Sequence, residues 1–150
     1  MRFLKLDKHL SEKVLTVSQS EELIKAGFVV KPHSSTMIWR KQLQDWSGED
    51  ISATTNYHLW FSSDSPVVMG FETFSEFPAY FDSELFENLP KEFVLDGNLW
   101  SLNMSCGNSE YFIEYSDTPL GKPIISVHGK TLLEVSYLAH KELLNLNIHE

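Results

Sequence analysis

The sequence has little of what marks secreted or membrane-spanning proteins. Cys106 is the only cysteine, so the chain cannot form an intrachain disulfide. An uncharged apolar run of about 18 residues, the length that a transmembrane helix needs, does not occur. Residues 1–14 carry charges throughout and lack the apolar stretch of a secretory signal. We therefore expect a protein of the reducing cytoplasm that does not bind a membrane.

Motifs that name an enzymatic activity are also missing. The sequence contains no CxxC, HExxH, GxSxG or GxGxxG pattern, and Gly129-Lys130-Thr131 lacks the earlier glycine of a phosphate-binding loop. None of the six histidines has another histidine two to five residues away, which is the spacing of a metal-binding pair. We expect no metal, no cofactor and no enzymatic activity.

Basic residues are nearly absent from the middle of the chain. Residues 42–121 contain fourteen Asp or Glu and one base, Lys91, whereas residues 1–41 have eight bases and four acids. The formal net charge of −9 repels nucleic acid and anionic membranes and attracts basic surfaces. We therefore expect a basic protein partner and no nucleic acid. The alternative is that the acidity only aids solubility.

The length and the hydrophobic content, 42% of residues, indicate one folded domain over residues 1–150. Turn signals recur about every ten residues, which is typical of strands. The dipeptide Asp96-Gly97 lies between alternating apolar residues, a strong hairpin signal. We expect strands at residues 2–6, 28–30, 36–43, 56–62, 66–71, 110–116 and 124–129, and a hairpin over 93–102.

Two further segments have the pattern of helices. Residues 18–27 predict a short helix, with Ser18 and Glu21 as a capping box and Gly27 just past the end. Residues 130–147 are apolar over most of a helical circumference, so that helix should be mostly buried. The sequence thus predicts an α+β fold, a mainly antiparallel sheet with two or three helices packed on one face, including a long and mostly buried C-terminal helix.

Residues 74–89 show a third helical period. Pro78 is tolerated only in the first turn of a helix, so the helix should begin near residues 75–77, and Pro90 should stop it. One face carries Phe77, Phe81 and Leu85 and should meet the core.

The flanks of this expected helix carry carboxylates around two rings that lie off the core face. Protein interfaces favour aromatic side chains at the centre and charge at the rim. The sequence therefore predicts a partner-binding surface made of Glu76, Tyr80, Asp82, Glu84, Phe86 and Glu87. The alternative for Phe86 is that it packs under residues 91–95.

In its size, its acidity and its lack of catalytic motifs, the chain resembles the immunity proteins that protect bacteria from toxic nucleases. Antitoxins and inhibitors that mimic nucleic acid share these properties. The resemblance implies a protein-binding module that neutralises a basic partner. Two alternatives stay open: a small enzyme with a site assembled around His58, Cys106 and His128, and a structural or assembly subunit that oligomerises through its last helix.

Overall fold

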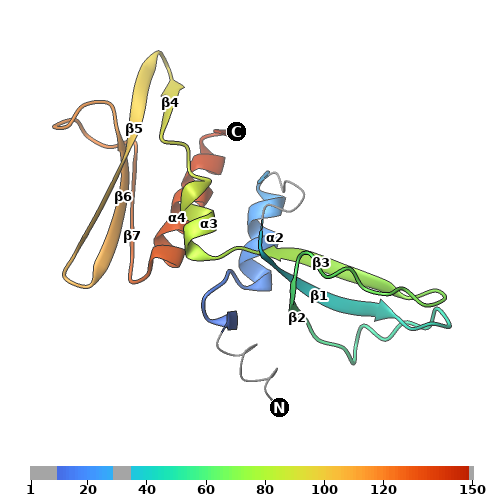
Figure 1. Cartoon of the computed structure of the whole chain (residues 1–150). Coiled ribbons are helices and arrows are strands. Elements are labelled where there is room, and N and C mark those ends of the chain that lie inside the picture. Colours follow the sequence, from blue (N-terminus) through green and yellow to red (C-terminus); the bar gives the residue numbers. More distant parts are fainter. Residues whose placement is uncertain (1–9, 29–34, 149–150) are drawn as a thin grey trace. The chain divides into compact units, whose positions relative to one another are not determined.

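The computed structural model describes residues 10–28 and 35–148, which form two compact units (Figure 1). In the described part, unit 1 contains residues 10–22 and 35–81, and unit 2 contains residues 23–28 and 82–148. Each unit has its own antiparallel sheet, so the predicted α+β class is confirmed, with the strands divided between two sheets. The single domain predicted over residues 1–150 stays a prediction.

The sheet of unit 1 has three strands in the order β2-β1-β3. They are β1 (Met37–Gln44), β2 (His58–Phe61) and β3 (Thr73–Ala79). Alternate residues of β1, Met37 and Trp39, point into the core of this unit, which also contains Val14 and Ala79. The indole Nε1 of Trp39 donates a hydrogen bond to the carbonyl of Leu15 at 2.7 Å. The central strand is thereby joined to the segment that leads into helix α2 (Val17–Lys25).

Helix α2 begins at a capping box, two residues earlier than expected. The side chain of Thr16 accepts a hydrogen bond from the N–H of Gln19, and the Gln19 side chain accepts one from the N–H of Thr16. The predicted box of Ser18 and Glu21 is therefore wrong, although its chemistry is the same. Thr-x-x-Gln and Ser-x-x-Glu satisfy orphan N–H groups in the same way, so spacing alone could not choose between the two boxes.

The predicted end of α2 at Gly27 is confirmed. Gly27 has a φ of 110°, a conformation that glycine adopts without steric cost. Its N–H donates to the carbonyl of Ile24, and the N–H of Phe28 donates to Leu23. These two bonds are those of a Schellman motif. The strands expected at residues 2–6 and 28–30 lie wholly or mostly outside the described residues.

The helix predicted from residues 75–77 onward is wrong in its first half. Residues Thr73–Ala79 form strand β3, in which Phe77 lies opposite Trp39 and Ala79 lies opposite Met37. Pro78 is accommodated because β3 is an edge strand, where a missing N–H costs little. The helix that remains, α3 (Asp82–Glu87), is short and ends before Pro90 as expected.

Unit 2 has a four-stranded meander in the order β4-β5-β6-β7, with helix α4 packed on its last two strands (Figure 1). The elements are β4 (Glu92–Leu95), β5 (Asn98–Gly107), β6 (Glu110–Ser116), β7 (Ile125–Gly129) and α4 (Leu132–Asn145). The apolar side chains of α4 pack against the sheet, as predicted for a mostly buried helix. The buried core consists of Leu89, Ile113, Tyr115, Ile125, Val135, Ala139 and Leu143.

The hairpin predicted at Asp96-Gly97 is confirmed. Leu95 pairs with Asn98, and the two residues between them have φ values of 53° and 81°. Two successive positive φ values make a type I′ turn, whose twist matches that of the flanking strands.

Replacing Gly97 with alanine should destabilise unit 2 through the backbone alone. A Cβ at Gly97 would meet no atom within 4 Å, so the cost is that of a non-glycine residue at positive φ, about 1–2 kcal/mol. Gly107 is the matched control, because a Cβ there also meets no atom within 4 Å and its φ is not in the left-handed region. Urea unfolding followed by circular dichroism measures both. Equal losses in Gly97→Ala and Gly107→Ala would contradict this account of the turn.

Candidate functional site

The six residues predicted to bind a partner do not share one helix face. Glu76 lies on strand β3 and Tyr80 directly follows this strand, both in unit 1. The other four residues belong to helix α3 of unit 2. The reason is the pairing of β3 with β1, which places residues 73–79 in an extended conformation. The helical spacing that grouped these side chains therefore does not apply before Asp82.

One ring of the predicted surface is buried and the other is partly buried. Tyr80 is 1% exposed and lies in the core, so its prediction as an exposed anchor is wrong. Phe86 is partly buried against the core cluster of unit 2 that contains Leu89. Phe93, from the segment 91–95, packs against the same cluster, and the expected packing of Phe86 under this segment stays a prediction.

The acids of α3 remain at the surface. Asp82 and Glu87 are exposed, Glu84 is half-buried, and the Asp82 carboxylate accepts a hydrogen bond from the N–H of Ser83 at 2.7 Å. Their role in binding a partner stays a prediction.

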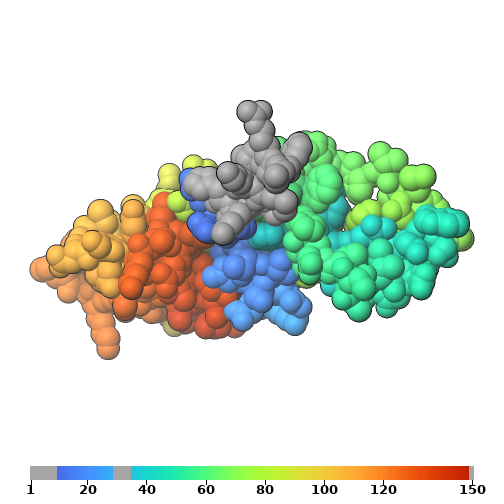
Figure 2. Space-filling model, turned by 90° about the horizontal axis from the view of Figure 1, so that it is seen from below, coloured from blue at the N-terminus to red at the C-terminus, as the bar shows by residue number. Residues whose placement is uncertain are grey.

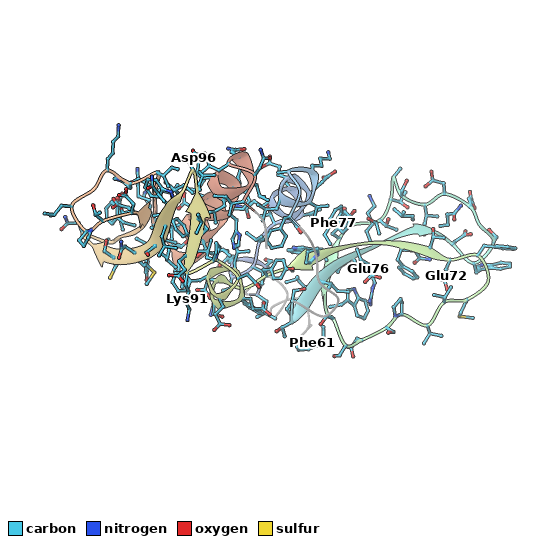
Figure 3. The ribbon with its side chains drawn as sticks, turned by 90° about the horizontal axis from the view of Figure 1, so that it is seen from above. Phe61, Glu72, Glu76, Phe77, Lys91 and Asp96 are labelled. Atoms are coloured by element: carbon cyan, nitrogen blue, oxygen red, sulfur yellow. The ribbon has the colours of Figure 1, made fainter. Side chains whose placement is uncertain are left out.

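Glu76 has a structural partner that the sequence did not predict. Its Oε2 accepts hydrogen bonds from Nε and Nη2 of Arg40, at 3.3 and 3.1 Å. Arg40 is only 6% exposed, its Nη2 also donates to the carbonyl of Asp64, and its guanidinium lies 5.3 Å from the centre of the Trp60 ring. Figure 3 shows Glu76 on β3, the strand that begins just after Glu72. The pairing balances the charge of Glu76, so this residue contributes less to a negative surface than its neighbours in sequence.

A pocket of about 370 Å³ lies on the sheet of unit 1 beside Arg40. Two lining residues on β1, Arg40 and Gln42, alternate with Trp39, which points into the core of this unit. The pocket therefore lies on the opposite face of the sheet. The lining holds one histidine and several amides and hydroxyls, and neither a cysteine nor a carboxylate is part of it. The residues are Arg40, Gln42, Thr54, Thr55, Asn56, His58, Trp60 and Phe74.

Cys106 and His128, proposed above for an assembled enzyme site, are not brought together. Cys106 pairs with Tyr111, and His128 pairs with Phe112, the next residue of β6. Successive residues of a strand point to opposite faces of a sheet, so the two side chains lie on opposite faces. The imidazole of His128 instead lies 3.6 Å from the carboxylate of Glu110.

The most exposed apolar side chains of unit 1 lie on two adjoining loops that the sequence did not single out. Residues 66–71, predicted as a strand, form a loop that lies beside the loop 45–50 after β1. The N–H of Phe71 donates to the carbonyl of Trp46 at 3.0 Å, which joins the two loops. Figure 2 shows the cyan atoms of the first loop against the green atoms of the second, at the far right. We call this the tip surface; its exposed side chains are Trp46, Val67, Val68, Met69 and Phe71.

The loop 45–50 is held by the carboxylate of Asp45. One oxygen, Oδ1, accepts hydrogen bonds from the N–H of Ser47 at 2.9 Å, the Ser47 hydroxyl at 2.6 Å and the N–H of Glu49 at 3.0 Å. The Ser47 hydroxyl is the largest cause of a lowered pKa of Asp45. Three donors on one oxygen fix the loop that presents Trp46.

The second loop is held in the same way by Glu72. Its Oε1 accepts from the N–H of Met69 at 2.7 Å, and its Oε2 accepts from the Gln42 side chain at 2.8 Å. Gly70 allows the two loops to approach closely, because a Cβ there would lie 2.4 Å from the Trp46 carbonyl. The tip surface is therefore built from ordered loops.

Only part of the tip surface leaves a signal in the sequence. Residues 66–71 are apolar and include the β-branched Val67 and Val68, a pattern that favours a buried strand as strongly as an exposed loop. The distance between Trp46 and Phe71 along the chain hides their proximity, which depends on the pairing of β1 with β3.

Known proteins give no further guidance to this site. Comparisons with protein-family models, with curated proteins and with solved structures yield no match to this chain. Within residues 10–28 and 35–148, no three His, Cys, Asp or Glu side chains are placed to hold a metal ion. The helices in this part of the chain are too short or too polar to cross a membrane.

Removing the Ser47 hydroxyl should raise the pKa of Asp45 toward its ordinary range, because the main hydrogen bond that favours the carboxylate is lost. A lowered pKa stabilises the fold above the ordinary aspartate range and loses that contribution as the pH falls through the lowered value. Acid should therefore destabilise the loop 45–50 less in the Ser47→Ala variant than in the wild type. A carbon-detected NMR titration of the side-chain carboxyl group measures this pKa.

Asp50 provides the matched control, because its pKa is lowered chiefly by the hydroxyl of Ser52. Ser47→Ala should leave the Asp50 titration unchanged, and Ser52→Ala should shift Asp50 alone. An Asp45 titration that is the same in Ser47→Ala and in the wild type would contradict the assignment.

Proposed function

We propose that the chain is a protein-binding module that neutralises a basic partner, as an immunity protein or antitoxin neutralises a nuclease-like toxin. The observation that carries the proposal is the acid excess of residues 42–121, fourteen carboxylates against the single base Lys91. All of these residues are described, and none of the fourteen carboxylates is buried: nine are exposed and five are half-buried. Their field therefore reaches the solvent.

A surface of this kind suits a partner whose own function requires positive charge. A nuclease is basic where it holds nucleic acid, so an acidic inhibitor can occupy that surface and keep substrate out. Attraction between opposite charges raises association rates from about 10⁵–10⁶ toward 10⁸–10⁹ M⁻¹s⁻¹ at low salt. Rapid capture is what a cell needs from an inhibitor of a toxin that acts within it. We place this activity in the cytoplasm, where the thiol of Cys106 stays reduced.

The neighbouring gene supplies the experiment. The full chain should restore growth when it is co-expressed with a growth-arresting basic protein encoded beside it. The purified pair should associate more slowly as salt is raised through the physiological range, because screening shortens the reach of the carboxylates. Stopped-flow fluorescence measures the rate.

An unrelated acidic protein of similar size and charge is the control, since it tests whether charge alone is enough. Growth arrest that persists in the presence of the folded chain would contradict the proposed function. So would an association rate that is independent of salt.

A further inference from the structure

The tip surface combines exposed apolar area with a charge of one sign. Trp46 is 70% exposed and Phe71 is 72% exposed, and three neighbouring apolar side chains are more than half exposed: Val67, Val68 and Met69. Large apolar side chains that gather on a surface commonly mark a site of interaction. Aromatic side chains offer about 150–250 Å² each to such a contact.

The segment that contains these side chains carries only acidic residues, and Lys41 on β1 is a base that acts on one of them, Asp50. Residues 45–72 contain five carboxylates and neither lysine nor arginine. Two of the five, Asp45 and Glu72, accept hydrogen bonds from uncharged N–H, hydroxyl and amide donors. Such donors order a carboxylate without cancelling its charge, so the rim of the tip surface stays negative. The apolar centre and acidic rim together match a partner surface in which lysine and arginine surround apolar side chains.

The alternative docking place, helix α3, has only the charge. Asp82 and Glu87 are exposed there, but the neighbouring ring of Phe86 packs against the core of unit 2. Binding energy at protein interfaces is concentrated in aromatic and other large side chains that become buried, whereas rim charges mainly set the rate of association. Of the two acidic regions, the tip surface is the one that has both parts.

We infer that the tip surface docks a basic protein partner, with Trp46 and Phe71 as the apolar contacts and Asp45, Glu49 and Glu72 among the rim charges. The inference rests on the proposed function and names the surface and the partner chemistry that carry it out. The occupant is a segment of the partner that places apolar side chains between lysines and arginines. Because both loops are held by internal hydrogen bonds, little ordering of the chain is required on binding.

Defined peptides test the inference on the full chain. The probe is a fluorescein-labelled arginine-rich peptide with a central Trp-Leu pair. One matched peptide has serines in place of that pair, and a second has glutamates in place of the arginines. Fluorescence anisotropy should show that the first peptide binds about tenfold more tightly than the serine peptide, and that the glutamate peptide does not bind.

Paired variants locate the contact. Trp46→Ser combined with Phe71→Ser should weaken binding of the first peptide about tenfold or more. Both changes leave in place the backbone bond that joins the loops. Val94→Ser combined with Leu99→Ser is the matched control, because these side chains are exposed and lie opposite each other in unit 2. The control should bind as the wild type does. Nitrogen-15 NMR spectra of each variant check the fold and should map peptide-induced shifts to residues 45–50 and 67–72.

Each contrary result has one meaning. Equal binding of the Trp-Leu and serine peptides would overturn the apolar contact. Binding that is lost in Glu84→Lys combined with Glu87→Lys, but kept in the tip variant, would move the docking surface to α3 and leave the proposed function standing. A wild type that sediments as a dimer and a tip variant that sediments as a monomer would make the surface a contact between copies. Peptide binding at the tip without rescue of growth would instead contradict the proposed function alone.

Discussion

The pairing of β1 with β3 is the constraint on which the other features of unit 1 depend. It places Phe77 opposite Trp39 and Glu76 opposite Arg40, across more than thirty residues of sequence. The first pairing puts apolar side chains into the core, and the second gives a nearly buried guanidinium its carboxylate. Beyond an irregularity at Gln42/Gln44, the pairing continues to Gln44 and Thr73 and brings the loop that contains Trp46 beside the loop that contains Phe71. A change in this pairing would alter the core, the ion pair and the tip surface together.

The same pairing explains where the sequence was sufficient and where it was not. Elements determined by residues close together in the chain were predicted from the sequence. They are the Asp96-Gly97 hairpin, strand β6, the end of α2 at Gly27 and helix α4. Residues 74–79 have apolar spacing that suits either a helix or an edge strand. Pairing with β1 selects the strand. The spacing of apolar residues within 74–79 contains no information about a strand more than thirty residues away in sequence.

The errors in the predicted binding surface have one cause: a helix was predicted for residues 75–79, which form part of strand β3. As a helical residue Tyr80 would have stood among carboxylates at the surface, but after a strand paired with β1 it enters the core. Glu76 would have been one of a row of free acids, but it faces Arg40. The acid excess itself could be read from composition, since it does not depend on the fold. The exposed apolar side chains that accompany it could not, because exposure is a property of the assembled loops.

The two kinds of side chain at the tip surface have different physical roles, and their combination is informative. Carboxylates without nearby bases repel one another, and exposed aromatic side chains gain nothing from water, so each is a cost in the isolated chain. Unit 1 limits the first cost by giving Asp45 and Glu72 neutral donors that preserve their charge, and it leaves the second cost unrelieved at Trp46 and Phe71. The two nearest bases before the loop 45–50 leave most of these carboxylates unbalanced, because Arg40 pairs with Glu76 and Lys41 acts on Asp50. A partner with apolar side chains among basic residues would relieve both costs at once, whereas a purely basic or a purely apolar partner would relieve only one.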